Sequence, residues 1–219
     1  MPLDYVPGVC CTVHGIFPLR GSRLPADHGA ALYAALCALP DIGRWLADAD
    51  DVAIGPVAGR TGADGLLTLT ADSRLLLRLP AAELPQILGL AGERLDVGGW
   101  QLDIGDPRVE VPHPVAALHA GLVVLDHLSD PAGQRAGSGD PGEPATADAF
   151  VAAVESQLAA LEIQSRIRVG APGCLQLPER KATGFALAIS GLAPDDSIHL
   201  QEAGLGDHRK LGCGVFVPA

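Results

Sequence analysis

The sequence predicts an α+β fold in which one order of elements, β-α-β-β-α-β, occurs twice. Three observations carry this prediction. Hydrophobic residues make up 48 % of the 219 residues, enough for a sizeable core. The apolar runs are short and are separated by many of the 27 glycines and 18 prolines. Segments with helical spacing fall between these runs. We therefore predict two tandem ferredoxin-like halves with a C-terminal glycine-rich loop.

The first half contains five apolar runs and two helical segments. A strand ends near Arg20, and a helix is expected in residues 24–39, where Leu32, Leu36 and Leu39 share a face and Pro25 suits the first turn. Strands are predicted in the runs DVAIGPV, GLLTLT and RLLLRL, a short helix in AAELPQILGL, and a further strand in GWQLDIGDPRVEV.

The second half repeats this order. A strand is predicted in ALHAGLVVLDHL, and residues 129–146 form a polar loop rich in glycine and proline. The helix of residues 147–163 has an apolar stripe and a candidate cap at Thr146 or Asp148. Strands in SRIRVG, CLQL and TGFALAISGL, a helix in APDDSIHLQEAGLG and a last strand in CGVFVP follow. We predict an N-terminal domain of residues 1–114 and a C-terminal domain of residues 115–219.

The charge is strongly acidic but unevenly distributed. The net charge is −11, with a balance of −12 in residues 1–162 and +1 in residues 163–219. Both lysines of the chain, Lys181 and Lys210, lie in the last quarter. Taken alone, the total argues against binding to nucleic acid, because phosphate binding draws on a basic surface, while the distribution allows a local basic patch.

Composition also excludes several classes of protein. No apolar stretch approaches the roughly 18 residues of a membrane-spanning helix, and the start MPLDYVPGVCC has an acid where a signal peptide needs positive charge. We expect a soluble, cytoplasmic protein. The five cysteines have no metal-ligand spacing, and no two histidines lie four apart on one helix. We therefore predict reduced, buried thiols, no metal site and no cofactor.

The chain ends in GLGDHRKLGCGVFVPA, in which Gly204, Gly206, Gly212 and Gly214 bracket three basic residues, His208, Arg209 and Lys210. Glycines let a backbone approach a ligand closely, and successive N–H groups can form a nest for a phosphate. Arginine and lysine would add charge. The alternative is a helix C-cap at Gly204, followed by a tight connection with solvated charges.

His28 is the best-placed histidine for chemistry. It lies in the first turn of the first predicted helix, where the helix dipole lowers the pKa of an imidazole. Gly29 beside it would leave room for a substrate, and Arg20 and Arg23 precede it as candidate phosphate contacts. A surface histidine near a helix start is the alternative.

A second set of basic residues lies in the predicted strands of the last quarter. Arg166 and Arg168 alternate on one strand face, and Arg180 with Lys181 on the adjoining turn would extend them into a basic strip.

These features together resemble a known family. The stretches FPLRGSRLPADHGAALYAAL and ISGLAPDDSIHLQEAGLGDHRKLGCGVFVP are similar to the CRISPR-associated repeat-RNA endoribonucleases, the sixth Cas family, and in particular to its MYXAN subtype. The resemblance implies a metal-independent endoribonuclease that cleaves the repeats of precursor CRISPR RNA. The 2′-hydroxyl attacks the adjacent phosphate, and a 2′,3′-cyclic phosphate results.

The resemblance also implies roles for residues and partners. His28 fits the place of the catalytic histidine. The glycine-rich loop would support the RNA, with Arg20, Arg23 and the basic residues of the last quarter as further contacts. The product would stay bound through the repeat hairpin, beside other subunits of an effector complex. Two rivals stay open: a catalytically inactive crRNA-binding subunit, and a ferredoxin-like module that binds small ligands or assembles without RNA.

Overall fold

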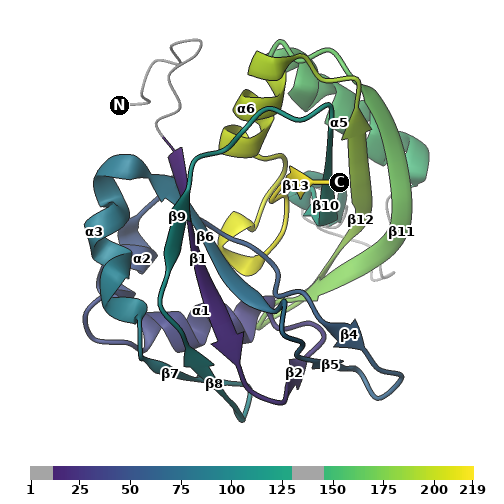
Figure 1. Cartoon of the computed structure of the whole chain (residues 1–219). Helices are drawn as coiled ribbons and strands as arrows, with labels where there is room; N and C mark the ends of the chain where they lie inside the picture. Colours follow the sequence, from purple (N-terminus) through teal and green to yellow (C-terminus); the bar gives the residue numbers. More distant parts are fainter. Residues whose placement is uncertain (1–11, 130–145) are drawn as a thin grey trace.

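Two antiparallel sheets form the framework of the protein (Figure 1). The computed structural model describes residues 12–129 and 146–219. The first sheet has the strand order β3 (Ala53–Ile54), β6 (Arg74–Pro80), β1 (Thr12–Arg20), β8 (Trp100–Ile104) and β7 (Arg94–Val97), and β9 (Arg108–Glu110) also pairs with β1. The second has the order β11 (Arg166–Gln176), β12 (Lys181–Ser190), β10 (Ala117–Val124) and β13 (Val217–Pro218).

The two sheets share one topology. Numbered along the chain, four strands of each sheet lie in the order 2-3-1-4, and their pairings are antiparallel. The predicted α+β class is confirmed, and the strand order that the two sheets share is the one expected of the two predicted ferredoxin-like halves. The predicted boundary at residues 114 and 115 falls between β9 and β10, and the division into two domains stays a prediction.

Helices cover one face of each sheet and enclose a separate core. The helices of the first half are α1 (Gly29–Cys37), α2 (Gly43–Asp48) and α3 (Leu84–Ile87), with 3₁₀ turns η1 (Ala81–Glu83) and η2 (Leu88–Leu90) beside α3. Those of the second half are α4 (Asp126–Ser129), α5 (Ala147–Ala160) and α6 (Pro194–Ala203), followed by the 3₁₀ turn η4 (Arg209–Leu211). Phe17 is fully buried in the first core and Phe216 in the second. Thr146 caps α5 as predicted, accepting a hydrogen bond from the Ala149 N–H.

The sequence did not predict a third, small sheet beside the start of α1. It consists of β2 (Arg23–Pro25), β5 (Leu66–Thr68) and β4 (Arg60–Thr61), in the order β2-β5-β4. Pro25, expected in the first turn of the helix, instead ends β2, and α1 begins at Gly29. The pairing of β2 with β5 places Pro25 opposite Leu66, so that a tertiary contact overrides the local preference of proline for a helix start.

Three further expectations differ from the structure. The two predicted strands SRIRVG and CLQL are one strand, β11, with an irregularity between Val169 and Pro172 that lets it continue. The run GWQLDIGDPRVEV is interrupted at residues 105–107. The part before the break, β8, pairs with the end of β1, and the part after it, β9, pairs with residues 14–16 of β1. Only Val217–Pro218 of the last run is a strand. The predicted polar loop lies almost wholly outside the described residues.

A buried polar contact joins the two halves. Arg78 on β6 is 2 % exposed, and its Nε donates a hydrogen bond to His14 Nε2 at 3.1 Å. Its Nη2 donates to the carbonyl of Phe216 at 2.6 Å, 138 residues away along the chain. His14 must be unprotonated at Nε2 to accept, and burial, followed by the neighbouring Arg78 charge, lowers its pKa from 6.5 to about 4.

This contact predicts a pH dependence of stability. Between pH 6.5 and 4 the unfolded chain binds a proton at His14 that the folded chain does not, so stability must fall as the pH falls through this window. The single-site linkage amounts to about 2 kcal/mol at pH 5. Urea unfolding at pH 7 and pH 5 measures it. His14→Gln removes the titration, and we expect its loss of stability over the same pH range to be smaller by that amount. Equal losses in both proteins would contradict the prediction.

Candidate functional site

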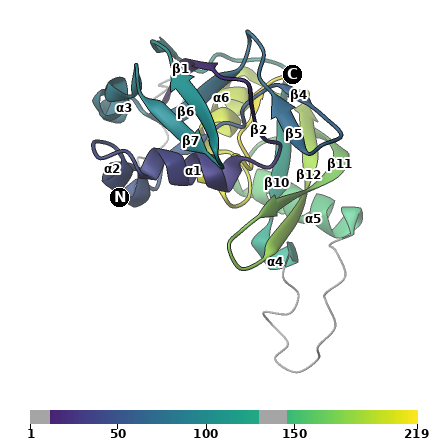
Figure 2. The ribbon, with the colours of Figure 1, turned by 90° about the horizontal axis from the view of Figure 1, so that it is seen from below.

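A cavity of about 500 Å³ lies where the two halves meet. It is lined by the segment before α1, the end of β3, the small sheet, β10, β11 and the glycine-rich loop (residues 26–29, 32, 54–57, 61, 67, 121–122, 174–175 and 211–213). Seen from below, the β11–β12 hairpin lies beside the N-terminal end of α1 (Figure 2). The Gln176 N–H on this hairpin donates to Asp27 Oδ2 at 2.7 Å and fixes the two halves at the cavity.

His28 lines this cavity, but both of its ring nitrogens bond the main chain. It is the N-cap residue of α1, one position before the first turn, and is 6 % exposed. Nδ1 lies 3.1 Å from the carbonyl oxygens of Pro25 and Ala26. Nε2 lies 2.9 Å from the Val57 amide nitrogen, whose N–H donates to it. These partners select the neutral tautomer that carries its proton on Nδ1.

The pKa of His28 is lowered, as the sequence predicted, but the main cause is different. Burial of the ring lowers it, while the hydrogen bonds to the carbonyls of Pro25 and Ala26 and the charge of Asp27 act in the opposite direction. The expectation that Gly29 leaves room for a substrate was wrong. A Cβ on Gly29 would lie 2.1 Å from the Leu211 carbonyl oxygen, so the glycine-rich loop occupies that space.

The glycine-rich loop packs closely on the second half through its backbone. Gly204, Gly206, Gly212 and Gly214 all have positive φ. A Cβ on Gly206 would lie 2.3 Å from the Val124 carbonyl oxygen, and one on Gly214 would lie 1.9 Å from that of Leu205. Glycine is therefore required at these positions by both conformation and space.

The expected nest of amides for a phosphate is not free at the glycines. The N–H of Gly204 donates to Leu200 O, that of Gly206 to Gln157 Oε1, that of Gly212 to Arg209 O, and that of Gly214 to Leu122 O. Each glycine amide thus already has a protein acceptor. The alternative weighed from the sequence, a helix C-cap at Gly204 with a tight connection, describes the backbone well, because Gly204 is the C-cap of α6.

The three basic side chains of the loop also bond the protein. Arg209 Nη1 donates to the carbonyl of Ala203 in the last turn of α6. Lys210 Nζ donates to the carbonyls of Leu46 at 2.9 Å and Ala47 at 3.1 Å in the last turn of α2. Cations at helix C-termini satisfy carbonyls that have no partner within the helix. Lys210 thereby ties the loop to the first half.

His208 belongs to a charged cluster with Asp126 and Arg180. Asp126 Oδ1 accepts from Arg180 Nη2 at 2.7 Å and lies 2.9 Å from His208 Nε2. Burial raises the pKa of the Asp126 carboxyl, but hydrogen bonds from Arg180 and His208 outweigh burial and hold this pKa below its ordinary value. This cluster connects the hairpin to the loop, and no pattern in the sequence pointed to Asp126.

The predicted basic strip is divided in the structure. Arg166 and Arg168 are exposed on one face of β11, as their alternation predicted. Lys181 pairs with Gln176 at the other end of the hairpin, about 25 Å from Arg168 at the usual rise of a strand. Arg180 and Lys181 therefore lie near the cavity, and Arg166 and Arg168 do not.

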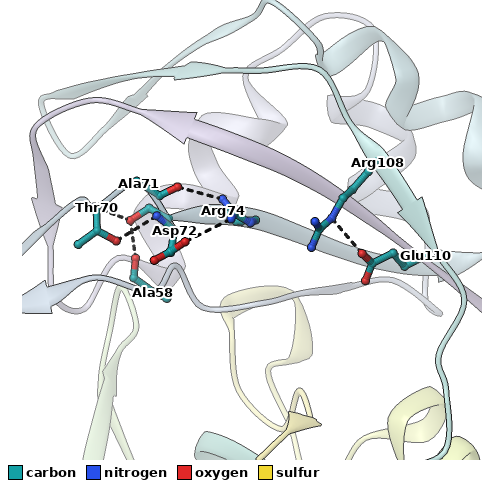
Figure 3. Close-up of polar contacts among 8 residues, drawn as sticks. Ala58, Thr70, Ala71, Asp72, Arg74, Arg108 and Glu110 are labelled. Atoms are coloured by element: carbon teal, nitrogen blue, oxygen red, sulfur yellow. Dashed lines mark hydrogen bonds and ion pairs between the residues drawn. The ribbon is translucent and has the colours of Figure 1, made fainter.

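Of four further arginines in the first half, Arg74 and Arg108 were not singled out from the sequence, whereas Arg20 and Arg23 were. Arg74 on β6 bonds Asp72 and the Ala71 carbonyl, and Arg108 on β9 bonds Glu110 on the same strand (Figure 3). Arg20 ends β1 opposite Asp103, and Arg23 lies on β2 with Asp64 3.5 Å away. Most of these charges are thus partly compensated by an adjacent carboxylate.

Of the described cysteines, Cys213 is buried, Cys37 is half-buried and Cys174 is exposed, so the prediction of buried thiols was wrong at Cys174. Burial raises the pKa of the Cys213 thiol to about 12. Cys10 and Cys11 lie outside the described residues. Over residues 12–129 and 146–219, no helix is long and apolar enough to cross a membrane.

Solved structures with this fold include CRISPR-associated proteins, one of them bound to RNA. A chain titled CRISPR associated protein Cas6 has a TM-score of 0.60 and 12 % identity, covering 95 % of this chain and 98 % of that one. Cse3 of Thermus thermophilus, bound to an RNA representing a pre-cleavage complex, has a TM-score of 0.55 and 12 % identity, covering 94 % and 98 %. At this identity the likeness shows the fold.

Sequence comparison shows the family. The family model described as Cas6 Crispr matches residues 13–219. The CRISPR-associated endonuclease Cas6 of Myxococcus xanthus (strain DK1622) is 32 % identical over 204 residues, which cover 93 % of this chain and 80 % of that protein. The chain therefore belongs to the Cas6 family of CRISPR-associated proteins, and the resemblance seen at the two ends of the sequence is confirmed.

The close backbone packing of the loop predicts a difference between two glycines. Gly214→Ala adds a Cβ against the Leu205 carbonyl at positive φ, whereas Gly191→Ala adds one at positive φ in open space. The backbone conformation alone costs about 1–2 kcal/mol, and overpacking adds about 1–3 kcal/mol at Gly214. Urea unfolding should show Gly214→Ala to be the more destabilised by the second amount. Equal destabilisation would show that the contact relaxes without cost.

Proposed function

We propose that this protein is an endoribonuclease that cleaves the repeats of precursor CRISPR RNA to give guide RNA. The observation that carries the proposal is the cavity between the two halves, which holds a buried histidine at the start of α1 in a chain of the Cas6 family. The related Myxococcus xanthus protein is named an endonuclease, and the Thermus thermophilus neighbour was solved with RNA.

The proposed reaction needs no metal ion or cofactor. The 2′-hydroxyl oxygen attacks the adjacent phosphorus, the bond from phosphorus to the 5′-oxygen breaks, and a 2′,3′-cyclic phosphate and a 5′-hydroxyl result. One group must accept the proton of the 2′-hydroxyl, and another must protonate the leaving 5′-oxygen. The charge that develops on the phosphate needs cationic donors. Arg180 and Lys181, on the turn beside the cavity, are suited to this.

His28 is our candidate for one of the two proton transfers. Its lowered pKa keeps the ring neutral at pH 7, the form that accepts a proton. Nε2 can reach the RNA only if it exchanges the Val57 N–H for the 2′-hydroxyl. This exchange requires residues 54–57 at the end of β3 to shift when RNA enters, and catalytic hydrogen bonds often form only in the complex.

The same hydrogen bonds favour a second candidate function. Both ring nitrogens of His28 bond the main chain, at Pro25, Ala26 and Val57, and these bonds are equally consistent with a purely structural role. The protein would then be a catalytically inactive subunit that binds crRNA. Membership of the Cas6 family argues against the third reading, a module unrelated to RNA.

We further propose that the protein works in the cytoplasm, keeps the product through its repeat hairpin and joins other effector-complex subunits. Family membership supports each of these points. The proposed RNA contacts remain Arg20, Arg23, Arg166, Arg168, Arg180, Lys181 and the loop residues Gly204, Gly206, His208, Arg209, Lys210, Gly212 and Gly214. The loop would act through its shape and through the N–H donors of Arg209 and Lys210 that do not bond helix carbonyls.

Cleavage in EDTA tests the proposed function. Wild-type protein should cut the cognate repeat RNA and leave a 2′,3′-cyclic phosphate end. His28→Ala should bind the RNA but cut it about 10²–10⁴ times more slowly, the usual contribution of a general acid or base. His14→Gln, which alters a buried histidine outside the cavity, is the control and should cut normally.

His28→Ala also removes the acceptor of the Val57 N–H, so its folded fraction must be measured by circular dichroism before rates are compared. A folded variant that cuts at the wild-type rate would remove His28 from the chemistry. Binding by the wild type without any cutting would support the inactive subunit instead.

A further inference from the structure

The small sheet beside the cavity carries a row of side chains that the proposed function does not yet use. Arg23 on β2 and Arg60 on β4 are both directly opposite Thr68 on β5, the central strand. Residues directly opposite each other in antiparallel strands project from the same face. All three are exposed, and two strand spacings place the Cα atoms of the arginines about 10 Å apart.

The other face of this sheet is fixed to the protein at the cavity. Leu24 is 0 % exposed and Leu67 is 6 % exposed, and both belong to the first core. Thr61 and Leu67 line the cavity itself. The Ala26 N–H donates to the Gly65 carbonyl at 2.9 Å, which ties the turn between β4 and β5 to the segment just before His28. The arginine row therefore stands on a rigid support at the rim of the candidate site.

A similar row elsewhere in the first half is neutralised. Arg20 and Arg94 lie directly opposite Asp103 on neighbouring strands, and Arg94 Nε bonds the Asp103 carboxylate at 2.7 Å. In the small sheet the position between the two arginines is occupied by Thr68, which has a hydroxyl group and no carboxylate. Arg60 has no ion pair among the described residues, and Arg23 has only a 3.5 Å contact with the half-exposed Asp64. In a protein with a net charge of −11, such an arginine pair is conspicuous.

We propose that Arg23, Thr68 and Arg60 bind the phosphate backbone of the RNA where the strand leaves the cavity. This inference rests on the proposed function and adds Arg60 and Thr68 to its RNA contacts. Each guanidinium presents paired N–H donors that match a phosphate, and the Thr68 hydroxyl can donate to a phosphate oxygen between them. Contacts of this kind hold the RNA in register without reading its sequence.

Asp64 acts as an internal competitor at this site. Its Oδ2 contacts Arg23, while its Oδ1 accepts the Leu66 N–H and shapes the turn. Asp64→Asn keeps an oxygen for the Leu66 N–H and removes the charge that competes with a phosphate. This variant should therefore bind RNA more tightly than the wild type, a gain that damage to the fold would not produce.

The test measures the Kd for the repeat hairpin RNA as a function of salt concentration. Arg60→Ala should weaken binding several-fold and lower the slope of log K against log salt by about 0.7–0.9, the value for one lost phosphate contact. Arg94→Ala makes the same change in net charge in the neutralised row and should leave the slope unchanged. Asp64→Asn should tighten binding about two- to fivefold at low salt, and Asp41→Asn, with the same charge change far from the row, should not.

Two outcomes would overturn the inference. If Arg60→Ala keeps the wild-type affinity and salt slope, Arg60 does not contact the RNA. If Arg60→Ala and Arg94→Ala have equal effects, the change comes from the net charge of the protein and not from a contact at Arg60. Failure of the proposed function looks different: wild-type protein would bind the repeat hairpin without cutting it, or would bind it no better than an unrelated RNA of equal length.

Discussion

The arrangement of the two halves depends on the close approach of the C-terminal backbone to its neighbours. Gly206 and Gly214 sit against carbonyl oxygens where a side chain has no room, and Gly29 at the start of α1 receives the Leu211 carbonyl in the same way. Because protein interiors are close-packed, a methyl group added at Gly29 must move one half relative to the other, and one added at Gly206 or Gly214 must move the loop on the second half. The cavity, the position of His28 and the β11–β12 hairpin all depend on this backbone contact.

The basic residues of the loop follow from the same constraint. A loop packed this tightly between helix ends places Arg209 and Lys210 where helix carbonyls lack partners, and His208 where it meets Asp126. The charge of Lys210 therefore helps to hold the halves together, while Arg209 and His208 fix the loop to the second half. An acidic protein that binds RNA must then find cationic surface elsewhere. Arg60, which has no ion pair among the described residues, and the weakly paired Arg23 in the small sheet at the cavity rim are suited to that purpose.

His28 combines a position suited to chemistry with bonds suited to structure. Its place at the helix start beside a cavity suits the acid or base role that we propose, while its ring nitrogens complete the hydrogen bonding of a buried backbone turn. The two roles are compatible if RNA displaces the Val57 amide, since that amide then needs a new acceptor, which a phosphate oxygen would supply. Catalysis and the ordering of residues 54–57 would be coupled through one hydrogen bond.

The sequence alone determined the fold class, most of the longer helices and strands, and the resemblance to the family, because apolar periodicity, helix caps such as Thr146 and turn glycines act over a few residues. It also placed His28 near the start of α1. Only the tertiary structure decided what these residues contact. Pro25 joined a strand because β5 lay beside it, Asp126 met His208 from 82 residues away, and Arg60 met Thr68 and Arg23 across three strands. Strand pairing and packing between the halves join residues that are far apart in the sequence, and local sequence patterns do not predict such contacts.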